Sequence, residues 1–180
     1  MGIYNYSVQD AKGNDVSLAK YKGKVILIVN TATDCGFTPH YTELEQMYKT
    51  YHERGLEIID VPCNQFGEQA AGSNAEITEF CKLHYNTTFP QMKKSDVNGK
   101  DALPLFDYLK SQKGFVGFGD GELAKKMDEF IGSIDADYKN NSDIKWNFTK
   151  FVISKDGEVV ARFEPTAPMS DVASCVIGCL

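Results

Sequence analysis

The segment KVILIVNTATDCGFTPHYTELEQMYKTYHERGLEIIDVP, residues 24–62, contains two aliphatic runs with a helical pattern between them. The runs 24–30 and 56–62 are rich in Ile and Val, which is typical of strands buried on both faces. Between them, Thr38 can cap a helix with Pro39 at its first position, and a glycine follows the helix. The segment therefore predicts a βαβ unit with parallel strands.

Three more helical patterns follow this unit along the chain. Ser73 and Glu76 have the spacing of a capping box, which opens a helix over about 75–84. Residues 102–112 and 121–132 have the pattern of two further helices, and a glycine-rich linker separates them.

The end of the chain predicts a β-hairpin and a short closing helix. Two apolar runs meet at Asp156 and Gly157, a dipeptide that fits the positive φ angles of a tight turn. The order βαβ, helices, hairpin and helix resembles the layout of thioredoxin-like α/β proteins, with a central mixed β-sheet flanked by helices. At 180 residues, the chain is expected to form one domain over 1–180.

Charge and hydropathy exclude several classes of partner. The net charge is −6 and only two arginines occur, so the basic surface needed for nucleic acid is missing. No run approaches the roughly 18 apolar residues of a membrane span, and the N-terminus lacks the apolar core of a signal peptide. We expect no nucleic-acid partner, no stable membrane association and a cytoplasmic location.

Five cysteines, an odd number in a chain without a secretion signal, favour free thiols over a disulfide scaffold. Cys35 lies between the first strand and the following helix, where the helix N-terminus is expected to lower the pKa of a thiol from about 8.5. The alternative is that Cys35 only fills a small gap near the strand end. A CxxC pair is disfavoured because position 38 is Thr38, and the threonine that a peroxiredoxin needs is replaced by Ala32.

Four separated motifs carry a resemblance to a known family: NTATDCGFTPHY, VPCNQFGEQAAGS, EITEFC and IKWNFTKFVISKDGEVVARFEPT. In this order they strongly resemble the glutathione peroxidase family in its cysteine form, over nearly the whole chain from Tyr4 to about Thr166. The resemblance implies a thioredoxin-like fold and an enzyme that reduces hydrogen peroxide and organic or lipid hydroperoxides.

By motif, the resemblance implies a catalytic tetrad of Cys35, Gln69, Trp146 and Asn147. Cys35 would attack the peroxide, and the side-chain N–H groups of the other three would stabilise the charge that develops on oxygen. Without the resemblance, Trp146 would be read as a core aromatic residue, and Gln69 and Asn147 as loop residues.

Cys81, in EITEFC, matches the resolving cysteine of thioredoxin-dependent members. A disulfide requires Cα atoms within roughly 7 Å, so we expect the helix around 75–84 to melt locally when Cys35 is oxidised. The alternative is a buried helix residue that faces the core with Ile77. Cys63 is interpreted as structural, Cys175 and Cys179 receive no role, and no cofactor or metal site is predicted.

The expected reductant is thioredoxin or a similar dithiol protein. Glutathione-using members carry arginines near the site, where a guanidinium can hold the tripeptide carboxylates, and His40 takes one such place here. Glutathione remains the alternative reductant. A peroxide sensor that relays oxidation to a partner and a non-catalytic binding module are the rival functions.

Residues 113–143 form an insertion relative to compact thioredoxin-dependent members. Its helix carries an apolar stripe, expected to pack within its own domain rather than on another subunit, at Leu123, Met127, Phe130 and Ile131. A monomer or a small homo-oligomer is expected.

Overall fold

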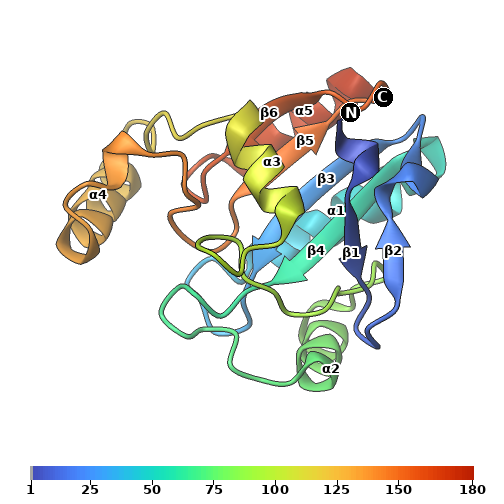
Figure 1. The fold of residues 1–180 in the computed structure, drawn as a ribbon, viewed down its shortest axis with the longest axis horizontal. Coiled ribbons are helices and arrows are strands. Elements are labelled where there is room, and N and C mark those ends of the chain that lie inside the picture. The colour runs from blue at the N-terminus through green and yellow to red at the C-terminus, as the bar shows by residue number, and fades with distance from the viewer. Residues whose placement is uncertain (1) are drawn as a thin grey trace.

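The computed structural model describes residues 2–180, and its centre is a four-stranded sheet (Figure 1). Strands β3 and β4 pair in parallel, with Val25 opposite Leu56, whereas β5 is antiparallel to β3 and to β6. The predicted mixed sheet and parallel βαβ pair are therefore confirmed. The strands, in sheet order, are β4 (Leu56–Pro62), β3 (Val25–Thr31), β5 (Lys150–Ile153) and β6 (Val159–Phe163).

Helices cover both faces of this sheet. Because successive side chains of a strand point to opposite faces, Ile26 and Ile28 of β3 pack with α3, while Val25, Leu27 and Val29 pack with α1, α2 and α5. Helix α4 lies apart from the strands, at the left of Figure 1. The helices are α1 (His40–Tyr51), α2 (Asn74–Tyr85), α3 (Pro104–Gln112), α4 (Glu122–Ile134) and α5 (Met169–Cys179).

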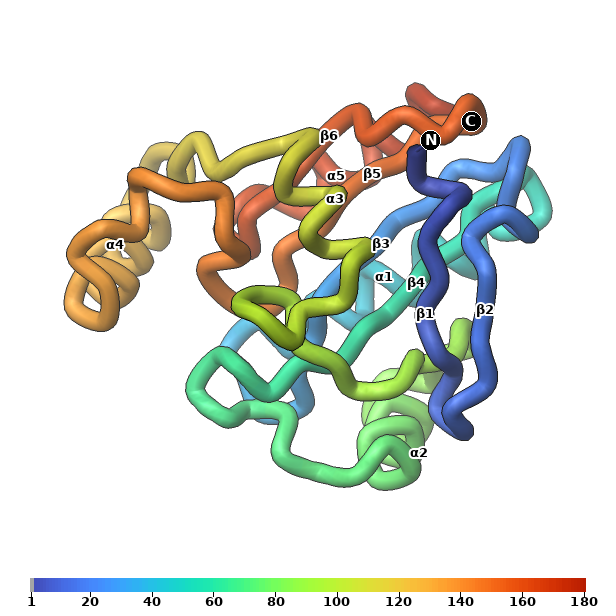
Figure 2. The backbone as a smooth tube through the Cα atoms, in the orientation of Figure 1, coloured from blue at the N-terminus to red at the C-terminus, as the bar shows by residue number. Residues whose placement is uncertain are grey.

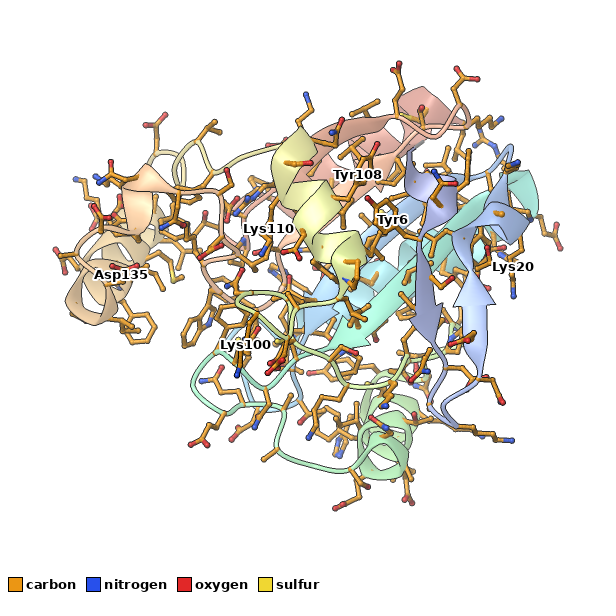
Figure 3. All side chains as sticks on the ribbon, viewed as in Figure 1. Tyr6, Lys20, Lys100, Tyr108, Lys110 and Asp135 are labelled. Atoms are coloured by element: carbon orange, nitrogen blue, oxygen red, sulfur yellow. The ribbon has the colours of Figure 1, made fainter. Side chains whose placement is uncertain are left out.

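A small N-terminal hairpin, β1 (Ser7–Gln9) and β2 (Asp15–Ser17), was not predicted. Its strands are three residues each, too short for a periodic pattern to stand out. Tyr6, just before β1, stacks on Tyr108 of α3 with ring centroids 4.9 Å apart (Figure 3). Short 3₁₀ helices complete the fold, at Ile3–Asn5, Leu18–Tyr21, His52–Arg54 and Tyr138–Asn140.

The start of α1 differs from the prediction. The helix begins at His40, and Thr38 does not cap it. Instead the Thr38 hydroxyl accepts a hydrogen bond from the Cys35 N–H at 3.0 Å and donates one to the Ala32 carbonyl at 2.9 Å. The threonine therefore closes the turn that carries Cys35.

The capping box of α2 is confirmed, since Ser73 Oγ accepts from the Glu76 N–H and the Glu76 carboxylate accepts from the Ser73 N–H. Helix α3 begins at Pro104 rather than at 102, because the residue before a proline avoids helical geometry. The closing helix is confirmed as α5.

The β5–β6 hairpin is confirmed, but its turn is wider than predicted. Ser154 and Glu158 close it with a 2.9 Å backbone hydrogen bond, and of the two predicted turn residues only Gly157 has a positive φ. Lys155 in this turn contacts both ends of the chain, because its carbonyl accepts from Tyr4 Oη and its Nζ donates to the Leu180 carbonyl. The two ends accordingly lie close together (Figure 2).

Helix α4 packs within its own chain through Met127 and Ile131, as predicted. Leu123 is 49% exposed, so the predicted stripe is wrong at this position. Phe130 is 44% exposed, but its ring contacts the Trp146 ring of the same chain, with centroids 4.9 Å apart. Within residues 2–180, no helix combines the length and the apolar character that crossing a bilayer requires.

Candidate active site

Cys35 lies in the turn between β3 and α1 and is partly exposed. Its sulfur accepts a hydrogen bond from the Phe37 N–H, with N and Sγ 3.3 Å apart. Thr38 fixes the backbone of the same turn from the other side. A backbone donor aimed at sulfur stabilises negative charge there, so the turn suits a nucleophilic thiolate.

The loop between β4 and α2 is hydrogen-bonded to this turn. The Gln69 carbonyl accepts from the N–H groups of Thr33 at 3.1 Å and Asp34 at 2.9 Å. Asn64 Oδ1 accepts from the Ala70 N–H, which fixes the loop internally. The two segments thus meet at one end of the sheet, where the backbone can be followed in Figure 2. Backbone contacts therefore tie Gln69 to the two residues that precede Cys35.

Trp146 and Asn147 approach the same loop from the segment before β5. The buried Asn147 donates from Nδ2 to Gln69 Oε1 at 3.0 Å and to the Phe66 carbonyl at 3.4 Å. The Trp146 carbonyl accepts from Asn30 Nδ2 at 3.1 Å. A side-chain hydrogen bond therefore joins Gln69 and Asn147, and Trp146 is the neighbour of Asn147 in the chain. The link to Cys35 runs through the backbone bonds of Gln69 to Thr33 and Asp34.

The orientations of the two side-chain amides give Gln69 and Asn147 different roles. Because Asn147 uses its N–H groups on Gln69 Oε1 and the Phe66 carbonyl, the Nε2 donors of Gln69 are the ones available to another acceptor. Asn147 thereby orients the Gln69 amide. Trp146 is 8% exposed, and its ring contacts the rings of Phe66 and Phe130, with centroids 5.9 Å and 4.9 Å away.

Cys81 is fully buried on α2, in the core cluster that also contains Tyr41 and Ile77. Burial and, to a smaller extent, the charge of Asp60 together raise the pKa of its thiol to about 12. Cys63 is also fully buried, and burial raises its pKa to about 11, which fits a structural role. All five cysteines are free thiols.

Sequence reasoning missed two buried polar groups beside the site. Lys150 on β5 is fully buried, and its Nζ lies 2.9 Å from His40 Nδ1. Asp60 on β4 is fully buried as well and accepts from the hydroxyls of Thr31 and Tyr41. Both groups belong to strands and pair with residues distant in sequence, so no local spacing marks them.

Among residues 2–180, no three His, Cys, Asp or Glu side chains group closely enough to ligate a metal.

The sheet order and the cysteine turn between β3 and α1 define a thioredoxin-like protein with an accessible thiol. A family model described as glutathione peroxidase matches residues 3–110. The chain belongs to the glutathione peroxidase family, and it is an oxidoreductase of the peroxidase class.

Relatives with solved or curated descriptions cover almost the whole chain. A glutathione peroxidase homolog of Neisseria meningitidis is 46% identical over 181 residues, which is 96% of each chain. The glutathione peroxidase-like peroxiredoxin 2 of Saccharomyces cerevisiae is 46% identical over 170 residues, covering 93% of this chain and 91% of its own. The crystal structure of Trgpx in apo form superposes with a TM-score of 0.69 at 32% identity, covering 99% of this chain and 95% of that one.

Proposed function

We propose that the protein is a thiol peroxidase that reduces hydrogen peroxide and organic hydroperoxides, lipid hydroperoxides included, through Cys35. The thiolate attacks one peroxide oxygen, the O–O bond breaks, and an S–O bond forms. The other oxygen takes up a proton and leaves as water or an alcohol, and Cys35 becomes a sulfenic acid. The observation that carries this proposal is the bonded set of Gln69 and Asn147 beside Trp146, tied to the Cys35 turn.

In this mechanism the leaving oxygen needs donors that are already in place. The Gln69 Nε2 group is the available amide donor, and Asn147 holds it. The indole N–H of Trp146 is the second donor. Loss of one such preorganised donor elsewhere costs about two to three orders of magnitude in rate, which is the size we expect at Gln69.

Cys81 resolves the sulfenic acid in the proposed cycle. Its thiol attacks the Cys35 sulfur, the S–O bond breaks, water leaves, and a Cys35–Cys81 disulfide forms. A buried thiol with a pKa of about 12 is inert, so resolution requires α2 to open and release Cys81 to solvent.

A dithiol protein such as thioredoxin is the proposed reductant. Both arginines are unsuited to hold glutathione at the site. Arg162 pairs with Glu164 at 2.7 Å, and Arg54 lies over the Tyr51 ring near the far end of α1. His40 is occupied by Lys150. Glutathione is the alternative reductant, and a reducing, cytoplasmic compartment suits the five free thiols.

Peptide mapping under non-reducing conditions tests the cycle. The reduced protein is treated with one equivalent of hydrogen peroxide, alongside Cys35→Ser and Cys81→Ser. A Cys35–Cys81 disulfide in the wild type, absent from both variants, is expected. Oxidation of Cys35 only to sulfenic or higher acids, with Cys81 free, would remove the resolving role. Fast oxidation of Cys35 with slow turnover on thioredoxin would favour a peroxide sensor.

A further inference from the structure

Lys150 is a fully buried lysine at the start of β5, on the sheet face that α1 covers. Its ammonium donates to His40 Nδ1 at 2.9 Å and to the Phe148 carbonyl at 2.8 Å. Within residues 2–180, Lys150 forms no ion pair with a carboxylate. Burying a cation without a carboxylate partner costs free energy of folding, so a lysine at this position indicates a role other than stability.

We propose that Lys150, held by His40, is a positioning residue for Cys35 that supplies the buried positive charge behind its thiolate. This role rests on the proposed function, in which Cys35 is the attacking residue.

A short series of contacts connects the lysine to the sulfur. The His40 ring that accepts from Lys150 lies 5.4 Å from the Phe37 ring, and the Phe37 N–H donates to Cys35 Sγ. His40 stands at the first turn of α1 and Cys35 five residues before it, so both lie at the same end of the helix. Lys150 is therefore linked to the Cys35 turn through His40 and Phe37, and the charge of Cys35 acts on the pKa of Lys150.

His40 is suited to hold an ammonium rather than to compete with it. Burial and, to a smaller extent, the charge of Lys150 together lower the pKa of His40 to about 3. The imidazole is therefore neutral near pH 7, with Nδ1 free to accept from Lys150. The only cation in the pair is the lysine.

The groups that face Lys150 set its charge. Burial lowers its pKa to about 7, while the negative charges of Glu164 after β6, Glu43 on α1 and Cys35 in the turn oppose this lowering. The attraction between the ammonium and the Cys35 thiolate is mutual, so each favours the charged form of the other. Lys150 is thus cationic below about pH 7 and is kept so longer while Cys35 is a thiolate.

The rate at which iodoacetamide labels Cys35 tests this role, because only the thiolate reacts. Mass spectrometry follows the Cys35 peptide separately, from about pH 5.5 to about pH 9, which brackets the titrations involved. In Lys150→Met we expect labelling about tenfold slower than in the wild type near pH 6, with the two curves converging at high pH. A merely structural role would not produce a deficit that disappears as pH rises.

Lys155→Met is the matched control, since it removes the same charge from an exposed lysine five residues along the hairpin. Its labelling profile is expected to equal that of the wild type. Trp146 is the single tryptophan, so its unchanged emission in Lys150→Met would exclude a displaced site. If Lys150→Met fails to fold, Lys150→Arg and Lys150→Gln replace it, and only the charged variant should keep fast labelling.

A wild-type profile in Lys150→Met, or equal slowing in the Arg and Gln variants, would overturn the proposal. Labelling needs no peroxide and no reductant, so it separates this inference from the proposed function. Retained peroxidase activity in Cys35→Ser would refute the proposed function while leaving the labelling result intact.

Discussion

At the scale of single residues, Gly67 shows how tightly the site is built. Its φ is +68°, and a Cβ there would lie 3.2 Å from Trp146 Cη2 and 3.4 Å from Gln69 Nε2. Any side chain at this position therefore meets the two proposed donors as well as an unfavourable backbone conformation. The loop needs glycine for both reasons.

Gly67→Ala is expected to lower the free energy of unfolding by about 1–2 kcal/mol, the cost of the left-handed conformation, and to slow peroxide reduction as Trp146 or Gln69 shifts. Gly13→Ala is the matched control, because Gly13 has a φ of +88° and open space around its Cβ direction. Denaturant unfolding and peroxide turnover are measured for both. Similar losses of stability are expected, with slower turnover in Gly67→Ala alone; equal turnover would mean that the contacts with Trp146 and Gln69 are unimportant.

Asp60 makes stability depend on pH. It is fully buried, its pKa is raised to about 6 by burial, and hydroxyl hydrogen bonds from Thr31 and Tyr41 oppose the rise. The folded state therefore binds a proton more tightly than the unfolded state. This contribution to stability is fully present below about pH 4 and is lost as pH rises through about 6, a change of about 3 kcal/mol.

Asp60→Asn is expected to remove this part of the pH dependence, because the amide does not ionise. The free energy of unfolding is measured in denaturant between about pH 3.5 and pH 8 for the wild type and the variant. The difference between them should change between about pH 4 and pH 6 and be constant above about pH 7. A constant difference would show that Asp60 keeps one protonation state throughout.

Only part of the site was accessible to sequence reasoning. Gln69, Trp146 and Asn147 were predicted through motifs, whereas their chemistry alone suggested a core tryptophan and two loop residues. Lys150 and His40 meet across 110 positions, and nothing in either neighbourhood distinguishes them from a surface lysine and a helix histidine. Such contacts depend on the register of β5 against β3.

At the scale of elements, α2 is the part that the proposed cycle requires to move. Its core face rests on Ile77 and Cys81, whereas Leu83 is 69% exposed. A helix of 12 residues has little stability of its own, so loss of the Cys81 contact on oxidation removes much of what holds it. Its capping box stabilises only the first turn.

Amide hydrogen exchange should therefore show loss of protection over residues 74–85 after treatment with one equivalent of peroxide. Residues 169–179 of α5, which pack on the same core cluster, serve as the internal reference and should stay protected. The Cys81→Ser variant should keep α2 protected under peroxide. Equal protection of α2 in the reduced and oxidised wild type would contradict local melting.

The elements themselves were largely predictable because most carry a strong local signal. The aliphatic runs of β3 and β4 and the capping box of α2 each depend on side chains close in sequence. The start of α1 was not predictable in this way, because Thr38 bonds backward to Ala32 and Cys35 instead of forward to the helix. A threonine before a proline can bond either backward into a turn or forward as a helix cap, and the tertiary contacts of the turn decide which bond forms.

At the scale of the whole molecule, the distribution of cations bears on the reductant. The net charge is −6, and Lys150, whose Nζ contacts His40 at the start of α1, is fully buried. Arg162 is 3% exposed in its side chain and donates to the carbonyls of Ser142 and Asp143 besides Glu164. A tripeptide with two carboxylates therefore finds no free guanidinium fork at this site within residues 2–180.

Thioredoxin should accordingly support faster peroxide reduction than glutathione, with the disulfide on Cys35 and Cys81 as its target. Turnover is measured with each reductant at saturating hydrogen peroxide, for the wild type and for Cys81→Ser. The variant should lose most of its rate with thioredoxin, because the sulfenic acid at Cys35 no longer becomes a disulfide, while its slower rate with glutathione should persist. The opposite result is that glutathione is the faster reductant and that Cys81→Ser leaves that rate unchanged. The contacts that bind glutathione would then come from lysines, and Cys81 would be a core residue that only helps to pack α2.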